Sequence, residues 1–190
     1  FEFVMREETT RARIRTLPHQ RLVLEFVMAH PVRVIRMPVG FSKTYLMIAL
    51  SLFFLGEDPT TRGLVISDTQ GQASKPLLAV RDYIERSAEL RTVFPALRPT
   101  QRQGDRWTQT ALVVDRPFGI RDPSLAAVGD QGAVAGSRIS WAVVDDVLSL
   151  ENTATPALRA KTHRWFESTV MSRLDPKNSH LVVTNTPWVG

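Results

Sequence analysis

Two short polar groups in this sequence combine residue types that bind and cleave phosphoanhydrides. Lys43 and Thr44 are adjacent in the stretch PVGFSKT, and Asp145 and Asp146 are adjacent much later in the chain. A lysine and a hydroxyl can hold phosphate oxygens and Mg²⁺, while paired carboxylates can hold Mg²⁺ and orient an attacking water. Together the two groups predict a site that hydrolyses a nucleotide with the help of Mg²⁺.

The stretch 38–44 departs from the usual phosphate-loop pattern, G-x-x-x-x-G-K-[ST]. That pattern would place glycines at Met37 and Ser42, whereas this stretch has its glycine at Gly40. The stretch nevertheless follows a predicted strand and opens a predicted helix, where backbone N–H groups and the helix dipole attract an anion. The alternative is a helix start that Ser, Lys and Thr merely cap. We predict nucleotide contacts from Pro38, Gly40, Phe41, Ser42, Lys43 and Thr44, with the Thr44 hydroxyl also binding Mg²⁺.

The acids Asp145 and Asp146 end an apolar stretch, 139–146, that is typical of a buried strand. Parallel strands end at the same edge of a sheet, where the phosphate loop would also lie. We therefore expect Asp145 to hold Mg²⁺ and Asp146 to orient the attacking water. A turn that caps the next helix is an alternative interpretation of the two acids, and Glu151 is a rival to Asp146 for the catalytic role.

The rest of the sequence predicts the elements that position these groups. Apolar and β-branched residues favour strands in 32–37, 63–69, 111–115, the start of 124–138, 139–146 and 180–185. Helical spacing predicts helices in 17–31, 43–55, 72–88 and 155–174, with Gly56 and Pro59 ending the second of them. Residues 1–16 are charged and predict a helical or irregular lead-in. Strands that alternate with helices indicate an α/β domain with a mostly parallel sheet flanked by helices.

The composition excludes several other kinds of protein. With 43% hydrophobic residues the chain can form a core, and its longest apolar run, 45–55, is too short for a membrane span. The absence of cysteine excludes disulfides and thiolate metal sites and fits a reducing compartment. The four histidines share no metal-ligand spacing. A net charge of +5 favours a polyanionic partner, although a solvated basic surface would give the same balance.

Further stretches occur in a fixed order along nearly the whole chain. They are LPHQ, PVGFSKT, GDRWTQTALVVD, GAVAGSRISWAVVDD, ENTATPALRAKTHRWFESTVMSRL and VVTNTPW. Together they resemble the ATPase domain of the large terminase subunit of tailed bacteriophages. The second stretch is similar to a phosphate-loop variant of that family with a shifted glycine, and the fourth to a Gly-x-Arg stretch that leads into Walker B. The resemblance implies a P-loop NTPase fold of the RecA-like (ASCE) type that binds ATP and Mg²⁺.

The resemblance also implies roles for residues outside the two polar groups. It places Gln20 against adenine, within an adenine-side lead-in of residues 1–31. It makes Arg138 an arginine finger for the neighbouring subunit of a ring, whereas a surface salt bridge with Asp130 or Asp145 is the alternative. It also assigns the coupling of hydrolysis to movement to Thr184, Asn185 and Thr186.

A packaging motor is the function that this resemblance implies. Residues 1–190 would form an ATPase domain that drives double-stranded viral DNA into a procapsid in the host cytoplasm, without membrane association. The implied partners are double-stranded DNA, further copies in a ring, the portal and the small terminase subunit. The nuclease domain that follows in the family would be absent from this chain.

Departures from the family pattern keep other functions open. Val39 stands where many members have arginine, and Asp146 stands where related ATPases have glutamate. Because of these residues and Ser42, one alternative is a catalytically inactive scaffold that binds nucleotide or DNA. A helicase-type ATPase fragment is another, although the Ser-Ala-Thr signature that helicases carry after Walker B is absent from the sequence.

Overall fold

The computed structural model describes residues 1–102, 106–134 and 138–186. Its strands are β1 (Val32–Arg36), β2 (Gly63–Ser67), β3 (Ala111–Leu112), β4 (Leu125–Gly129), β5 (Trp141–Asp145) and β6 (His180–Asn185). Its helices are α1 (Pro18–Ala29), α2 (Lys43–Glu57), α3 (Gln70–Arg86), α4 (Ala88–Val93), α5 (Leu150–Thr153) and α6 (Pro156–Trp165), then a π-helix η1 (Phe166–Val170) and a 3₁₀-helix η2 (Met171–Arg173). The predicted α/β class is confirmed.

The strands form one sheet in the order β1-β6-β5-β2-β4-β3. Every neighbouring pair is parallel except β3 with β4. The five parallel strands therefore end along one edge, called here the carboxyl edge, and begin along the opposite amino edge. At the carboxyl edge Arg36 pairs with Asn185, and Asp145 pairs with Thr184. Strand β6 thus lies between the strand that leads into the phosphate loop and the strand that ends in the acids.

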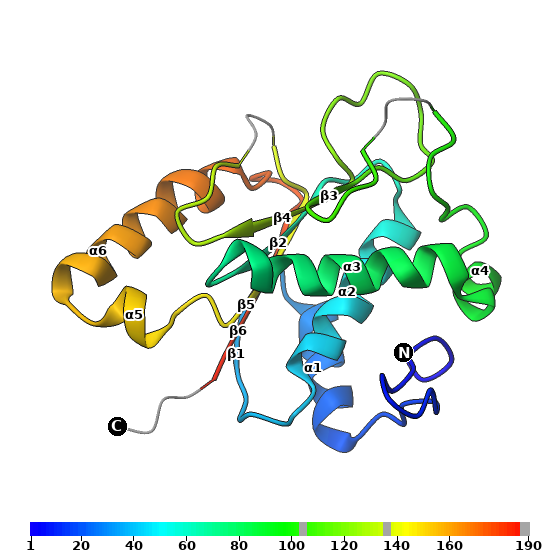
Figure 1. The fold of residues 1–190 in the computed structure, drawn as a ribbon, viewed down its shortest axis with the longest axis horizontal. Coiled ribbons are helices and arrows are strands. Elements are labelled where there is room, and N and C mark those ends of the chain that lie inside the picture. Colours follow the sequence, from blue (N-terminus) through cyan, green and yellow to red (C-terminus); the bar gives the residue numbers. More distant parts are fainter. Residues whose placement is uncertain (103–105, 135–137, 187–190) are drawn as a thin grey trace.

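Helices cover both faces of this sheet, with α1, α2 and α3 on one side and α5 and α6 on the other (Figure 1). Because side chains alternate along a strand, each buried strand contributes to two cores. Val65 and Val143 belong to the core that includes α2 and α3. Ile66 and Val144 belong to the second core, with Trp165 of α6. Burial on both faces fixes the position of the carboxyl edge, on which the site depends.

The predicted helix over 155–174 is present as a helical path whose hydrogen bonding changes after Trp165. The backbone hydrogen bonds join residues five apart in the π-helix η1 and three apart in the 3₁₀-helix η2. Trp165 and Val170 are both buried in the second core. These positions are i and i+5, which an α-helix places on different faces and a π-helix brings close together. The change of spacing therefore follows from the burial of both residues against the sheet.

Other predicted elements differ in smaller ways. Gly56 does not end α2, which runs on to Glu57. A Cβ at Gly56 would lie 2.4 Å from the ring of Phe94, so this glycine serves close packing. Residues 1–16 are irregular, with turns and an isolated bridge between Arg6 and Arg13. The sequence did not predict α4 or α5. No helix in the described ranges is long and apolar enough to cross a membrane.

Candidate active site

The phosphate loop joins the end of β1 to the start of α2. Gly40 has a φ of 85° and Ser42 a φ of 60°, so both residues have left-handed backbone conformations. Such a conformation costs a residue with a side chain about 1–2 kcal/mol, which explains why the usual pattern has glycine at the position of Ser42. The Ser42 side chain makes no capping hydrogen bond to the described residues of α2. Serine is therefore not the cap that the alternative interpretation requires.

The ammonium group of Lys43 lies inside this loop. Its Nζ donates hydrogen bonds to the carbonyl oxygens of Met37, at 3.1 Å, and Pro38, at 3.2 Å. It also lies 4.0 Å from a carboxylate oxygen of Asp146, and its side chain is only 8% exposed. The loop thus folds around the lysine, which brings a positive charge next to the amino end of α2.

Asp145 connects three elements at the carboxyl edge. Its Oδ2 accepts a hydrogen bond from the Thr44 hydroxyl at 3.0 Å, and its Oδ1 accepts one from the Thr184 hydroxyl at 2.8 Å. Burial raises the pKa of Asp145 above its usual value, against the lowering effect of these two hydroxyls and of Lys43. The neighbouring charge of Asp146 raises this pKa further. A partly buried carboxylate of this kind is suited to a cation, which would favour its charged form.

Asp146 directly follows β5 with a φ of 44°, a left-handed conformation that aspartate tolerates better than most residues. Its Oδ1 accepts a hydrogen bond from the Thr186 N–H at 2.6 Å, and its Oδ2 accepts one from the Thr186 hydroxyl at 2.9 Å. Two of the predicted coupling residues therefore contact the two acids, Thr184 on Asp145 and Thr186 on Asp146. Between them, the buried Asn185 Oδ1 has no hydrogen-bond partner among the described residues.

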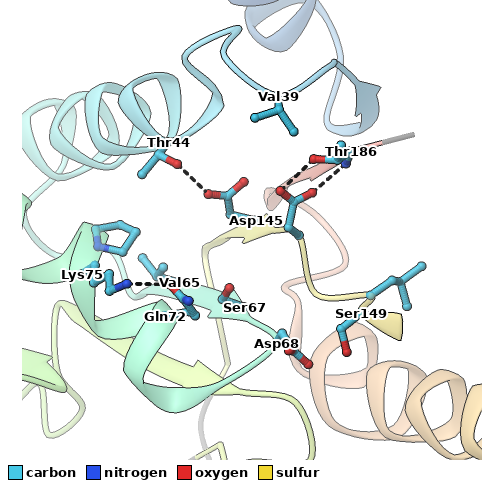
Figure 2. Close-up of a pocket in the computed structure, with 13 residues that line it drawn as sticks. Val39, Thr44, Val65, Ser67, Asp68, Gln72, Lys75, Asp145, Ser149 and Thr186 are labelled. Carbon is cyan, nitrogen blue, oxygen red and sulfur yellow. Dashed lines mark hydrogen bonds between the residues drawn. The ribbon is translucent and has the colours of Figure 1, made fainter. Parts of the chain in front are cut away.

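These groups open onto a cavity of about 490 Å³ at the carboxyl edge (Figure 2). Its volume lies within the range of about 300–1,000 Å³ that is usual for ligand pockets. Of the predicted site residues, the cavity brings together Thr44, Asp145, Asp146 and Thr186. The exposed side chain of Val39 also lines it. The remaining lining residues come from β2, α3 and the segment after β5: Val65, Ser67, Asp68, Gln72, Lys75, Pro76, Leu148 and Ser149.

The other predicted site residues do not line this cavity, and two of them, Glu151 and Gln20, lie on the separate helices α5 and α1. Glu151 is exposed on α5. Gln20 is 1% exposed, and its Oε1 accepts a hydrogen bond from the Leu17 N–H at 2.9 Å, which caps α1. The neighbouring His19 ring packs on the ring of Phe41 in the phosphate loop, with centroids 4.9 Å apart. The LPHQ segment therefore reaches the loop, and the contact of Gln20 with adenine stays a prediction.

Arg138 lies at the amino edge of the sheet, before β5 begins. Its Nη1 donates hydrogen bonds to the carbonyl oxygens of Ser172, at 3.3 Å, and Leu174, at 3.4 Å. The salt bridge with Asp130 or Asp145, weighed as an alternative, is therefore not the contact that Arg138 makes. The length of β5, roughly 16 Å for a strand of this size, separates Arg138 from the acids at the other end. In this conformation Arg138 does not reach the cavity of its own chain.

Sequence reasoning missed the cavity wall formed by β2 and α3, together with a polar network behind it. Asn152 Nδ2 donates hydrogen bonds to carboxylate oxygens of Asp68, at 3.1 Å, and Asp130, at 3.4 Å. The Thr162 hydroxyl donates to the same carboxylate of Asp130 at 3.0 Å. The network ties the ends of β2 and β4 to α5 and α6. The strand-end rule could have found Asp68, because this residue lies at the end of the strand predicted over 63–69 and directly follows β2.

The sequence and the fold are both similar to those of phage large terminase subunits. No family model matches the sequence. The large terminase subunit of Enterobacteria phage T3 is 26% identical over 122 residues, which make up 64% of this chain and 20% of that protein. The ATPase domain of the large terminase of Thermus phage P74-26 has a similar fold, with a TM-score of 0.59 and 17% identity over 93% of this chain and 71% of that one. The resemblance to a large-terminase ATPase domain is confirmed.

A mutant of the same Thermus phage domain aligns with a TM-score of 0.49 and 16% identity, over 84% of this chain and 61% of that one. The sequence match to the T3 protein spans only a fifth of that protein's length. The solved Thermus phage domain supports the fold of this chain, whereas its activity and its partners are matters for proposal.

Proposed function

We propose that this domain hydrolyses ATP with Mg²⁺ as the motor domain of a terminase large subunit, and that hydrolysis drives double-stranded viral DNA into a procapsid. One observation carries the proposal, which is that each of the two acids at the carboxyl edge contacts a different neighbour. Asp145 accepts a hydrogen bond from Thr44, directly after the phosphate-loop lysine. Asp146 accepts two from Thr186, just after β6. The likeness to large terminases favours this class over other P-loop ATPases.

Thr44 and Asp145 supply oxygens that fit Mg²⁺. Their facing oxygens lie 3.0 Å apart. Neighbouring ligands of an octahedral Mg²⁺ lie roughly 3 Å apart, because each metal–oxygen bond is about 2.0–2.1 Å long. The described residues contain no group of three or more His, Cys, Asp or Glu side chains able to hold a metal ion. Mg²⁺ nevertheless suits the pair of Thr44 and Asp145, because this ion takes few protein ligands and completes its coordination shell with phosphate oxygens and water. When bound, it would neutralise charge on the phosphates.

The protein groups around that position have separate tasks. Lys43 and the first N–H groups of α2 bind the phosphates, since both present positive charge at the loop. Asp146 orients the attacking water and accepts its proton, because its carboxylate faces the cavity and both its oxygens are fixed by Thr186. Release of the terminal phosphate changes the charge next to Asp146. The hydrogen bonds to Thr186 carry this change to the segment after β6, which is the coupling step.

A ring of subunits is the second part of the proposal. Arg138 is exposed at the amino edge and contacts only backbone carbonyls in the hydrogen bonds given above. A neighbouring subunit that docks its carboxyl edge there would receive a guanidinium group, which stabilises charge on a phosphoryl group in the transition state. By resemblance, the portal and the small terminase subunit are the further partners, and packaging takes place in the host cytoplasm.

The proposed activity is tested by measuring phosphate release from ATP with and without Mg²⁺. The wild type releases phosphate only with Mg²⁺, and Lys43→Ala abolishes release because the phosphates lose their principal cation. Lys161→Ala removes an exposed lysine on α6 and serves as the control that keeps activity. A wild type that binds ATP without releasing phosphate would indicate the inactive scaffold. Release by Lys43→Ala at the wild-type rate would place the site elsewhere.

A further inference from the structure

We propose that Lys75, on α3, binds the terminal phosphate of the nucleotide and supplies the positive charge that the phosphate loop lacks at Val39. The inference rests on the proposed ATPase function. It concerns the wall of the cavity that faces the loop, which neither the sequence motifs nor the likeness to other proteins assigns a role.

The position of Lys75 in the cavity is the first step. Lys75 and Gln72 are one helical turn apart on α3, and both line the cavity with Thr44 and Asp145. Figure 2 shows these two side chains on the α3 wall, across the cavity from Val39. Val39 is 80% exposed and brings no charge to the loop.

The charge balance of the cavity is the second step. Its lining includes three carboxylates, those of Asp68, Asp145 and Asp146, and Lys75 is the cation among the described residues that line it. The other lysine nearby, Lys43 of the phosphate loop, adds one positive charge against these three carboxylates. A triphosphate entering this acidic cavity therefore needs positive charge from the side of α3 as well as from bound metal.

The state of the Lys75 ammonium is the third step. Its Nζ donates to the neutral amide oxygen of Gln72 at 3.0 Å. None of the ion pairs within the described ranges includes Lys75. The ammonium thus has no carboxylate partner among these ion pairs and has further N–H donors for a phosphate oxygen. Gln72 positions the group without neutralising it.

The order of the strands shows which phosphate Lys75 would meet. In the sheet, β5 lies between β1, which leads into the phosphate loop, and β2, which leads into α3. A phosphate chain held at the loop by Lys43 extends past Asp145 toward α3. The phosphate that reaches farthest is the terminal one, which ATP has and ADP lacks.

Calorimetric titration with MgATP and with MgADP tests the inference on the wild type, Lys75→Ala, Lys75→Gln and Lys75→Arg, with Lys161→Ala as the control. ATP affinity falls roughly tenfold or more in Lys75→Ala and Lys75→Gln, as expected when a hydrogen bond to a charged group is lost. ADP affinity stays unchanged, Lys75→Arg keeps most of the preference for ATP, and Lys161→Ala changes neither affinity.

The outcomes separate this inference from the proposed function. If the wild type binds both nucleotides and Lys75→Ala weakens both equally, or neither, Lys75 does not meet the terminal phosphate and the inference is overturned alone. If the wild type binds neither nucleotide, the inference and the proposed function both fall. Thermal unfolding checks that each variant keeps its fold. We expect unchanged midpoints for the Lys75 variants, because Lys75 is exposed and lies outside the core.

Discussion

The two edges of the sheet differ in how their charged groups are held. At the carboxyl edge, Asp145 and Asp146 accept four hydrogen bonds from Thr44, Thr184 and Thr186 at distances of 2.6–3.0 Å. At the amino edge, Arg138 is exposed and makes two long contacts with backbone carbonyls. The comparison indicates that one chain preorganises its own acids and hydroxyls. Its arginine, by contrast, lies exposed at the opposite edge, which is where the proposed ring would present it to another chain.

The largest expected effect concerns the amino edge. We expect Arg138→Ala to bind ATP as the wild type does and to hydrolyse it about 10³- to 10⁵-fold more slowly, the usual effect of removing an arginine finger. Arg164→Ala, which removes an exposed arginine of α6, is the matched control. Single-turnover hydrolysis and nucleotide titration provide the two readouts. Normal turnover by Arg138→Ala would remove the amino edge from the mechanism.

At the carboxyl edge, the next largest effect separates Asp146 from its rival Glu151. Asp146→Asn keeps ATP binding and slows hydrolysis about 10²-fold or more, because a group that accepts the proton of the attacking water is lost. Glu151→Gln leaves the rate unchanged, since Glu151 is exposed on α5 and does not line the cavity. The reverse pattern in the same assays would show that α5 moves into the site when nucleotide binds.

A smaller effect on stability follows from the pKa of Asp145, which burial raises above the ordinary value of 3.8. Between the ordinary pKa of the unfolded state and the raised pKa of the native state, the native state binds more protons than the unfolded state. The free energy of unfolding therefore falls as pH rises through that window. The destabilisation persists at neutral pH. Asp145→Asn removes the charge, so in Mg²⁺-free buffer we expect it to be more stable than the wild type at pH 7.

Urea unfolding over a range of pH checks this expectation. The gain in the free energy of unfolding of Asp145→Asn should disappear as pH falls below the ordinary aspartate pKa, where both proteins are neutral at this position. A gain that is the same at every pH, or a loss at pH 7, would show that the hydrogen bonds from Thr44 and Thr184 outweigh burial.

The smallest expected effect concerns the loop itself. Ser42 has a φ of 60°. Ser42→Gly relieves strain of about 1–2 kcal/mol, of which glycine's greater freedom in the unfolded chain offsets roughly 0.5–1 kcal/mol. We therefore expect a stabilisation of up to about 1.5 kcal/mol with hydrolysis retained, whereas Ser42→Val destabilises the protein. Urea midpoints measure both changes, and a less stable Ser42→Gly would show that the serine side chain supports the loop.

Much of the carboxyl edge could be predicted from sequence, because a parallel sheet brings strand ends together. Residues that follow an apolar strand, such as Asp145, or that open the next helix, such as Thr44, have positions set by local pattern alone. Residues that precede a parallel strand lie at the amino edge, so the same reasoning would have placed Arg138 there, since it precedes β5. Roles such as the adenine contact of Gln20 remain predictions.

Other features depend on tertiary structure and leave no local signal. The left-handed conformation of Ser42 contradicts the preference of serine, and it occurs where the loop closes around Lys43. Lys75 lies in the site because the sheet order brings α3 next to the end of β5. The π-helical turn after Trp165 arises from burial against the sheet. Nothing in the spacing of these stretches encodes such contacts.

The most direct test of the account mixes two inactive variants. Lys43→Ala keeps Arg138 and loses the phosphate-loop cation, while Arg138→Ala keeps the loop and loses the finger. In a mixed ring, some sites combine an intact loop from one subunit with an intact arginine from the next. The account predicts that mixing restores part of the phosphate release, although each variant alone is inactive. No restoration, in mixtures whose mixed assemblies are demonstrated by cross-linking, would contradict the claim that the two edges of neighbouring subunits form one site.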